Sequence, residues 1–182
     1  FEITDPAITS QMVSSKASGA NVFYFAGTQK YGAMQLRSRS ELGWNPVSLV
    51  CSTASGLETV LRVAGLDKAE GLISAAYLKD PDDPRWAEDA DVKAFLAWVK
   101  DNFPKGTPQD YVYGYISSYL ISRVLEQAGS NLTRKNILEI ATHLTNVQVP
   151  LLLPGVTASS TPTDYALVKK FQMMRFKNGR WS

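Results

Sequence analysis

Residues Asn21–Trp44, NVFYFAGTQKYGAMQLRSRSELGW, carry the pattern that decides the fold. Five apolar residues, VFYFA, lead directly into a Gly-Thr-Gln-Lys turn, and a helical pattern follows at once. A nearly continuous apolar run of this length is typical of a parallel strand that is covered on both faces. The stretch therefore predicts a strand that ends where a helix begins, a position at which α/β proteins often bind ligands.

The same alternation continues through the first 77 residues. Beyond this strand, the pattern predicts strands at 46–52 and 70–77 and helices at 4–19, about 31–42 and 56–65. In the first helix we expect Asp5 as the N-cap and Gly19 as the terminator. Alternation of strands and helices predicts a parallel α/β sheet with right-handed crossovers.

The alternation breaks after residue 77. The segment LKDPDDPRW at 78–86 is a turn rich in Pro and Asp, and three helices follow it without an intervening strand. These helices are predicted over about 91–102, after the cap Thr107, and after the cap Thr133. The tail VKKFQMMRFKNGRW at 168–181 predicts an Asn-Gly hairpin. The fold class is thus α/β, with a sheet lobe interrupted by a helical excursion that returns.

Composition and charge exclude several classes of function. The 182 residues are 45% hydrophobic and carry a net charge of +2 with no basic block, which argues against a nucleic-acid partner. No apolar run approaches the roughly 18 residues of a membrane span. The single cysteine, Cys51, excludes an internal disulfide, and its apolar surroundings favour a buried, inert thiol. His143 has no partner at metal-ligand spacing, so we expect no metal and no cofactor.

Two catalytic motifs are imitated but incomplete. Gly27 and Gly32 have the spacing of a phosphate-binding loop, but Ala33 and Met34 replace the lysine and the hydroxyl that phosphate and magnesium need. The segment CSTASG at 51–56 does not fit the G-x-S-x-G of a nucleophile elbow.

Acid–base chemistry would have to use the acidic residues of the 78–86 turn, Asp80, Asp82 and Asp83. A solvated turn is the expected role of these residues, and their spacing does not match a calcium loop. We therefore expect no catalytic residues and no enzyme activity.

Small polar residues follow the first two predicted strands. They are Gly27, Thr28 and Gln29 after the first strand, and Ser52, Thr53 and Ser55 after the second. The carboxyl ends of parallel strands meet at one edge of a sheet, where open α/β proteins bind ligands. Hydroxyls and free N–H groups at helix N-termini suit a carboxylate or another acceptor-rich solute. The sequence predicts a ligand-binding edge without catalytic groups.

The segment DYVYGYISSYL adds an aromatic candidate. It places Tyr111, Tyr115 and Tyr119 on one helical face at four-residue spacing. Core packing is expected for the last two. Tyr111 lies in the first turn of the helix, where it either packs like the others or forms a wall for an organic ligand.

The order of these elements resembles one protein family. The segments ASGANVFYFAGTQKYGAMQLRSRSELGW, AEGLISAAY, YVYGYISSYLISRVLEQAG and LPGVTASSTPTDY…MMRFKNGRW resemble the carboxyl-terminal half of a branched-chain-amino-acid-type periplasmic solute-binding protein of ABC importers. The resemblance covers essentially all 182 residues. It implies the type I periplasmic-binding fold, in which two α/β lobes joined by three crossing segments hold the ligand between them.

The resemblance also implies a division into lobes. Residues 1–77 and 157–182 would form the second, three-layer lobe, and residues 78–156 would form the helical part of an incomplete first lobe with the crossing segments. The chain opens on FEITDPA without an initiator Met or a signal peptide, so we expect a mature or truncated product. Such a fragment would expose sheet edges and cleft, so we expect a second chain or a dimer partner to complete it.

The family's ligand contacts carry over to Thr28, Ser52 and Tyr111. Members that bind amino acids often have an acidic residue at the Ser52 position, which pairs with the ammonium of the ligand. Burying an unpaired ammonium costs several kcal/mol. We therefore expect a ligand without an α-amino group, such as an aromatic or aliphatic carboxylate or an amide.

The implied partners are a small-molecule solute and the membrane permease of an ABC importer. The implied location is periplasmic, or extracellular with a membrane anchor. The alternative function is a ligand-sensing regulatory or receptor domain of the same fold, which an attached output domain would reveal. An α/β hydrolase or transferase is disfavoured because the chain lacks a nucleophile–base pair.

Overall fold

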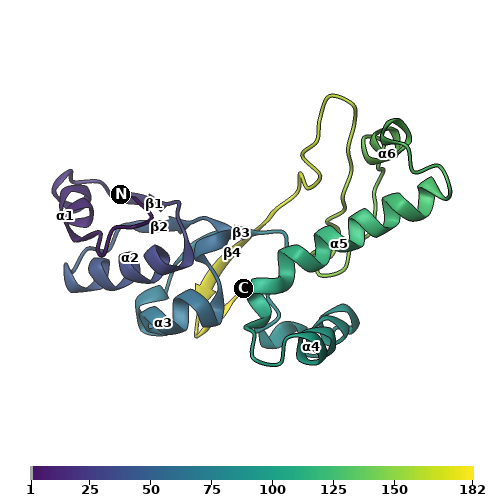
Figure 1. The fold of residues 1–182 in the computed structure, drawn as a ribbon. Coiled ribbons are helices and arrows are strands. Elements are labelled where there is room, and N and C mark those ends of the chain that lie inside the picture. The colour runs from purple at the N-terminus through teal and green to yellow at the C-terminus, as the bar shows by residue number, and fades with distance from the viewer. Residues whose placement is uncertain (1) are drawn as a thin grey trace. The chain divides into compact units, whose positions relative to one another are not determined.

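The structure is a computed structural model that describes residues 2–182, and it divides the chain into two compact units (Figure 1). Unit 1 contains residues 1–76 together with Met173–Ser182. Unit 2 contains Tyr77–Gln172.

Unit 1 is built on a sheet whose strands lie in the order β1-β2-β3-β4-β5. The bounds are β1 Val22–Phe25, β2 Val47–Val50, β3 Ile73–Ala76, β4 Gln172–Lys177 and β5 Arg180–Trp181. The first three strands pair in parallel, with Phe25 opposite Val50 and Leu49 opposite Ile73. The predicted parallel α/β sheet is confirmed.

The predicted hairpin at the tail is also present. β4 and β5 pair antiparallel, with Phe176 opposite Trp181. Asn178 and Gly179 form the turn with φ angles of 53° and 77°. Positive φ at both central residues is what an Asn-Gly hairpin turn requires.

The helices of unit 1 lie on one side of β1–β3 (Figure 1). They are α1 Thr9–Ala17, α2 Gln29–Glu41, the short helical turns Ser52–Ala54, Leu57–Leu61 and Leu66–Ala69, and α3 Arg62–Ala64. The predicted N-cap of the first helix is wrong, because the Asp5 carboxylate accepts a hydrogen bond from the Glu2 backbone N–H at 2.8 Å. The helix begins four residues later, at Thr9.

One face of the sheet carries the core and the other is open. Phe25 and Val50 point into the core, whereas Val22 and Tyr24 on the opposite face of β1 are 55% and 62% exposed. The expectation that both faces are covered is therefore wrong for β1 within the part of the chain that the structure describes. An apolar run indicates that a strand can be buried, but it does not identify the segment that covers the strand.

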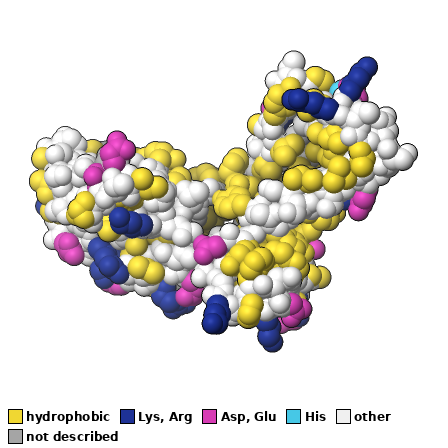
Figure 2. Space-filling view, in the orientation of Figure 1, with side chains coloured by type: hydrophobic (Ala, Val, Ile, Leu, Met, Phe, Trp, Pro, Cys, Tyr) yellow, Lys and Arg dark blue, Asp and Glu magenta, His cyan; other side chains and the backbone are white. Residues whose placement is uncertain are grey.

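Unit 2 contains the three predicted helices and a short turn of helix before them. The bounds are Pro84–Trp86 for the turn, α4 Ala90–Asn102, α5 Pro108–Ala128 and α6 Arg134–Ala141. The Asp89 side chain caps α4, and the Thr133 hydroxyl caps α6. Apolar side chains gather on the surface over α5 and α6 (Figure 2). Ile121 of α5 and Leu138 of α6 are exposed apolar residues of these helices.

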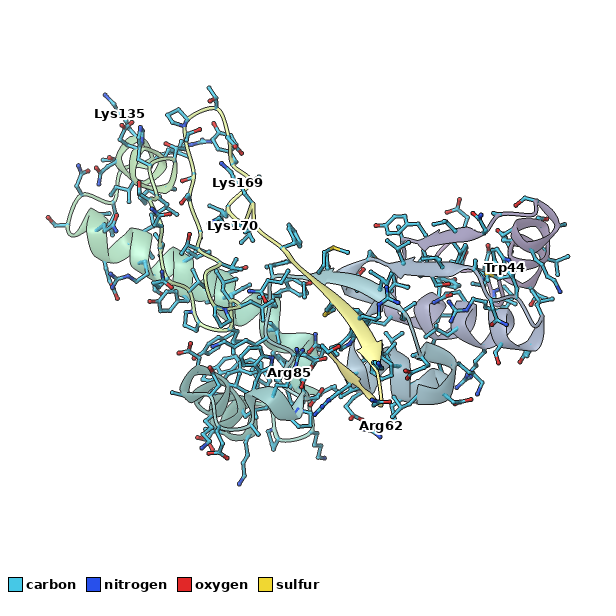
Figure 3. All side chains as sticks on the ribbon, turned by 180° about the vertical axis from the view of Figure 1, so that it is seen from behind. Trp44, Arg62, Arg85, Lys135, Lys169 and Lys170 are labelled. Atoms are coloured by element: carbon cyan, nitrogen blue, oxygen red, sulfur yellow. The ribbon has the colours of Figure 1, made fainter. Side chains whose placement is uncertain are left out.

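The Pro/Asp segment of unit 2 is more ordered than a solvated turn. Asp83 is buried, its carboxylate accepts from the Arg85 backbone N–H at 2.9 Å, and it forms an ion pair with Arg85 Nη2 at 2.7 Å (Arg85 is labelled in Figure 3). The buried Lys79 ammonium lies 2.7 Å from Asp89 Oδ2 and holds the pKa of that carboxyl below its ordinary value. For Asp83, the expectation of a solvated turn is therefore wrong. Among the described helices, none is long and apolar enough to cross a membrane.

Gly32 allows α2 to approach the core closely. A Cβ at this position would lie 3.0 Å from Ala54 Cβ and 3.1 Å from Val60 Cγ1. We predict that Gly32→Ala lowers the free energy of unfolding by about 1–3 kcal/mol, because the added methyl overpacks this contact. Urea denaturation measures the change. The control is Gly114→Ala in α5, where nothing lies within 4 Å of the new Cβ. It should raise stability by about 0.5–1 kcal/mol, and equal losses in the two variants would contradict the prediction.

Gln35 on α2 is fully buried, and among the described residues neither its Oε1 nor its Nε2 has a hydrogen-bond partner. A buried amide without partners costs free energy. We predict that Gln35→Met, which keeps the length of the side chain, raises the free energy of unfolding by about 1 kcal/mol. Gln127→Met at an exposed position of α5 is the control and should change little. A loss of stability in Gln35→Met alone would mean that the amide has partners in solution.

Candidate ligand-binding edge of the sheet

The candidate site of unit 1 lies where β1 and β2 end. These strands are parallel neighbours, so the segments that follow them begin side by side. Thr28 is the N-cap residue of α2, and Ser52 begins the first helical turn after β2. The structure therefore brings together five of the six predicted contact residues, Gly27, Thr28, Gln29, Ser52 and Thr53.

A hydrogen bond joins the two segments directly. The Thr53 hydroxyl donates to the Gly27 carbonyl at 3.0 Å, and the Cys51 N–H donates to the Phe25 carbonyl at 3.0 Å. The second bond continues the strand pairing, and the first extends it one step past the strand ends. Thr53 thus positions the Gly27 turn while remaining exposed at the edge.

Cys51 also contacts this turn. Its sulfur accepts a hydrogen bond from the Gly27 N–H at 3.5 Å and lies 3.0 Å from Thr53 Oγ1. Burial raises the pKa of the Cys51 thiol, but its hydrogen bond with the Thr53 hydroxyl and those with neighbouring backbone groups outweigh this effect, so the pKa lies below its ordinary value. The expectation of a buried thiol is wrong, because Cys51 is the first residue past the strand and is half-buried. Its inertness stays a prediction.

Several polar groups of the edge are available to a ligand. Among the described residues, the hydroxyls of Thr28 and Ser52 and the amide of Gln29 make no hydrogen bond, and no side chain caps α2. The first backbone bond of this helix runs from the Gly32 N–H to the Thr28 carbonyl. The N–H groups of Thr28 and Gln29 therefore lie ahead of the hydrogen-bonded turns, and such groups favour negative charge.

Lys30 does not supply a charge to this edge. Its ammonium donates to the Asp5 carbonyl at 3.0 Å and lies over the Tyr31 ring, 4.8 Å from the centroid. The Tyr31 hydroxyl itself lies 2.8 Å from the same carbonyl oxygen. Lys30 thus links the N-terminal segment to α2 through this hydrogen bond. The groups of the candidate edge are neutral.

Tyr111, the sixth predicted residue, belongs to unit 2. Its ring stacks on Phe103 with the centroids 4.4 Å apart, and it lies against Gly106, where a Cβ would come within 2.4 Å of its hydroxyl. Tyr115 packs among Phe95 and Trp98, as expected for a core residue. Tyr111 is half-buried and its role as a ligand contact stays a prediction.

Two contacts that hold the edge were missed by sequence reasoning. The buried Ser74 hydroxyl on β3 donates to the carbonyl of Val50, the last residue of β2, at 2.9 Å. The indole N–H of Trp181 donates to the Ser55 carbonyl at 3.0 Å, across a sequence separation of 126 residues. Neither bond has a local signal, because each is made by distant segments that the fold brings together.

A family model described as "Periplasmic binding protein" matches residues 1–180 of the chain. The chain belongs to the periplasmic binding protein family. A search of curated proteins finds no match to this family member.

Three of the solved structures of similar fold are compared by identity, TM-score and coverage. The leucine binding protein LivK of Thermotoga maritima is 20% identical with a TM-score of 0.71, and the match covers 100% of this chain and 49% of that one. A substrate-binding periplasmic protein of Ralstonia solanacearum is 17% identical with a TM-score of 0.80, covering 100% and 50%. A fatty acid ABC transporter substrate-binding protein of Thermomonospora curvata is 16% identical with a TM-score of 0.67, covering 100% and 46%.

These similarities establish the fold of this periplasmic binding protein. The chain shares the type I fold predicted from the sequence and spans about half the length of the structures that it matches.

The Cys51 thiol reports on the hydrogen bonding of the edge. We predict that Thr53→Val raises the pKa of Cys51, because it removes the hydroxyl that lowers this pKa. The pH dependence of alkylation by iodoacetamide, followed on the Cys51 peptide, measures the shift. Thr28→Val removes a neighbouring hydroxyl that does not contact the sulfur and should leave the profile unchanged. An unchanged profile in Thr53→Val would show that the backbone groups alone set the pKa.

Proposed function

We propose that this chain is part of an extracytoplasmic solute-binding component of an ABC importer. One observation carries the proposal: a member of the periplasmic binding protein family presents, at the ends of two parallel strands, neutral hydroxyl, amide and N–H groups without a nucleophile–base pair. Groups of this kind bind and orient a solute but do not transform it. The proposed role is therefore capture, not catalysis.

The proposed solute contacts are the groups described above. Gly27, Thr28 and Gln29 would offer backbone N–H groups and side chains from the α2 turn, and Ser52 and Thr53 would offer hydroxyls from the β2 loop. Tyr111 would add an aromatic wall from unit 2. The available N–H groups at the start of α2 support an acceptor-rich solute such as a carboxylate or an amide.

The neutral Ser52 supports a solute without an α-amino group. A buried ammonium needs an anionic partner, and neither the Gly27–Gln29 turn nor the 51–55 loop contains an acidic residue. One matched structure is named for leucine and another for a fatty acid, so the same fold serves both classes of ligand. An aromatic or aliphatic carboxylate or an amide is the solute that we propose.

The proposed partner is a membrane permease, and the proposed location is the periplasm or the outer surface of the cell. As lobes we propose residues 1–77 with 157–182 and residues 78–156, whereas the compact units group residues 157–172 with unit 2. We also propose that a further polypeptide segment covers the open face of the unit 1 sheet, where Val22 and Tyr24 are exposed. The similar proteins do not support the expected dimer partner.

Leucine and 4-methylpentanoate separate the two ligand classes, because they differ only in the α-ammonium. We predict that the intact protein binds leucine about 100-fold or more weakly than 4-methylpentanoate, which corresponds to the cost of an unpaired ammonium. Isothermal titration calorimetry measures both affinities, with benzoate and isobutyramide as further probes.

Substitutions at Ser52 sharpen this test. Ser52→Glu supplies the missing anion and should shift preference toward leucine, whereas Ser52→Ala should not. Tight binding of leucine by the unaltered protein, without binding of any carboxylate or amide, would overturn the proposed solute class. A protein that binds none of these compounds would contradict the proposed function itself.

A further inference from the structure

The loop from Cys51 to Ser55 carries two of the proposed solute contacts and is held from three directions. Thr53 ties it to the Gly27 turn, and the Ser74 hydroxyl on β3 fixes the preceding residue, Val50. The third attachment comes from the far end of the chain, through Trp181.

The Trp181 bond lies in the core and leads directly to the loop. Trp181 is 2% exposed, and its Nε1–H donates to the Ser55 carbonyl at 3.0 Å. The buried Ser55 hydroxyl in turn donates to the Ser52 carbonyl at 2.7 Å. Ser55 therefore links the indole to Ser52, the residue that we propose as a solute contact: its carbonyl bonds to Trp181 and its hydroxyl to Ser52.

The hairpin that carries Trp181 is itself firmly anchored beside β3, where β4 and β5 appear as the yellow strands (Figure 3). Phe176 is fully buried, and its ring meets Trp181 edge to face with the centroids 5.4 Å apart. The Phe176 N–H donates to the Leu72 carbonyl at 2.8 Å, and its carbonyl accepts from the Gly71 N–H at 2.9 Å. The Asn178 N–H donates to the Glu70 carboxylate at 3.1 Å. The indole is thus a fixed donor.

We propose that Trp181 is a positioning residue for solute binding: its indole N–H fixes the Ser52–Ser55 loop in the geometry that meets the solute. That the loop meets a solute rests on the proposed function. That Trp181 fixes the loop rests on the hydrogen bonds alone. A residue that only filled the core would be replaceable by any aromatic side chain, whereas a positioning residue needs the N–H.

The test uses Trp181→Phe, which keeps an aromatic ring in the core but removes the donor. Loss of one buried hydrogen bond should raise the rate of Cys51 alkylation by iodoacetamide about tenfold, because the loop opens more often. The rates are compared at a pH above the pKa of the thiol, where a change of that pKa does not alter them. The rate is followed by mass spectrometry of the Cys51 peptide in the intact protein under native conditions. The affinity for 4-methylpentanoate should fall in the same variant.

Trp44→Phe is the matched control. Trp44 is also buried in unit 1, packs on Phe23 with the centroids 5.1 Å apart, and precedes β2 at the end of the strand opposite to Cys51 (Trp44 is labelled in Figure 3). This substitution also replaces an indole with a benzene ring, so it should lower the free energy of unfolding without accelerating alkylation.

A second variant keeps the proposal testable if Trp181→Phe does not fold. Incorporation of 3-benzothienylalanine at position 181 keeps the bicyclic shape and replaces only the N–H with sulfur. Faster alkylation in both position-181 variants, at unfolding free energies no lower than that of Trp44→Phe, supports the proposal. Alkylation rates that depend only on the unfolding free energy in all three variants overturn it.

The binding measurements separate the two proposals. If the unaltered protein binds none of the solutes, the proposed function fails, and the alkylation rates still decide whether Trp181 positions the loop. If the unaltered protein binds 4-methylpentanoate and both position-181 variants bind it equally well, the positioning role in solute binding is wrong.

Discussion

The parallel pairing of β1 with β2 is the constraint on which the rest of unit 1 depends. It places the residues after Phe25 beside the residues after Val50, and the contacts between the Gly27 turn and the 51–55 loop follow from that adjacency. The Thr53–Gly27 hydrogen bond extends the pairing beyond the strands. A change of register by one residue would move Phe25 and Val50 out of the core, so the register and the site are specified by the same buried side chains.

Much of the fold could be predicted from the sequence, because its signals are local. The apolar run at 22–26 predicted β1, and the turn after it predicted a helix at about 31–42, which begins two residues earlier, at Gln29. The Asn178-Gly179 dipeptide predicted the hairpin. Asp5 failed as a predicted cap because its carboxylate accepts a hydrogen bond from the Glu2 backbone N–H and the helix begins only at Thr9. The local signal was present there, and a competing local bond overrode it.

The site was less predictable than the fold. Periodicity and chain order were enough to bring Thr28 and Ser52 to one edge, since parallel strands must end together. They could not reveal that Cys51 is half-buried or that Trp181 reaches Ser55, because side-chain direction past the end of a strand and contacts between distant segments depend on the packed structure. The same limit explains why the burial of Asp83 was not predicted. A Pro/Asp-rich segment is typical of the surface, and the ion pair of Asp83 with Arg85 is visible only in the structure.

Unit 1 is discontinuous in sequence, and this has a consequence for how the protein folds as it is synthesised. β1, β2 and β3 leave the ribosome early, but the two largest aromatic side chains of the hairpin, Phe176 and Trp181, arrive only after all of unit 2. Until then the nascent sheet lacks part of its core, and the loop after β2 lacks its indole donor. Unit 1 can therefore be completed only after the hairpin has been synthesised. Until then its apolar strands are exposed and can form non-native contacts.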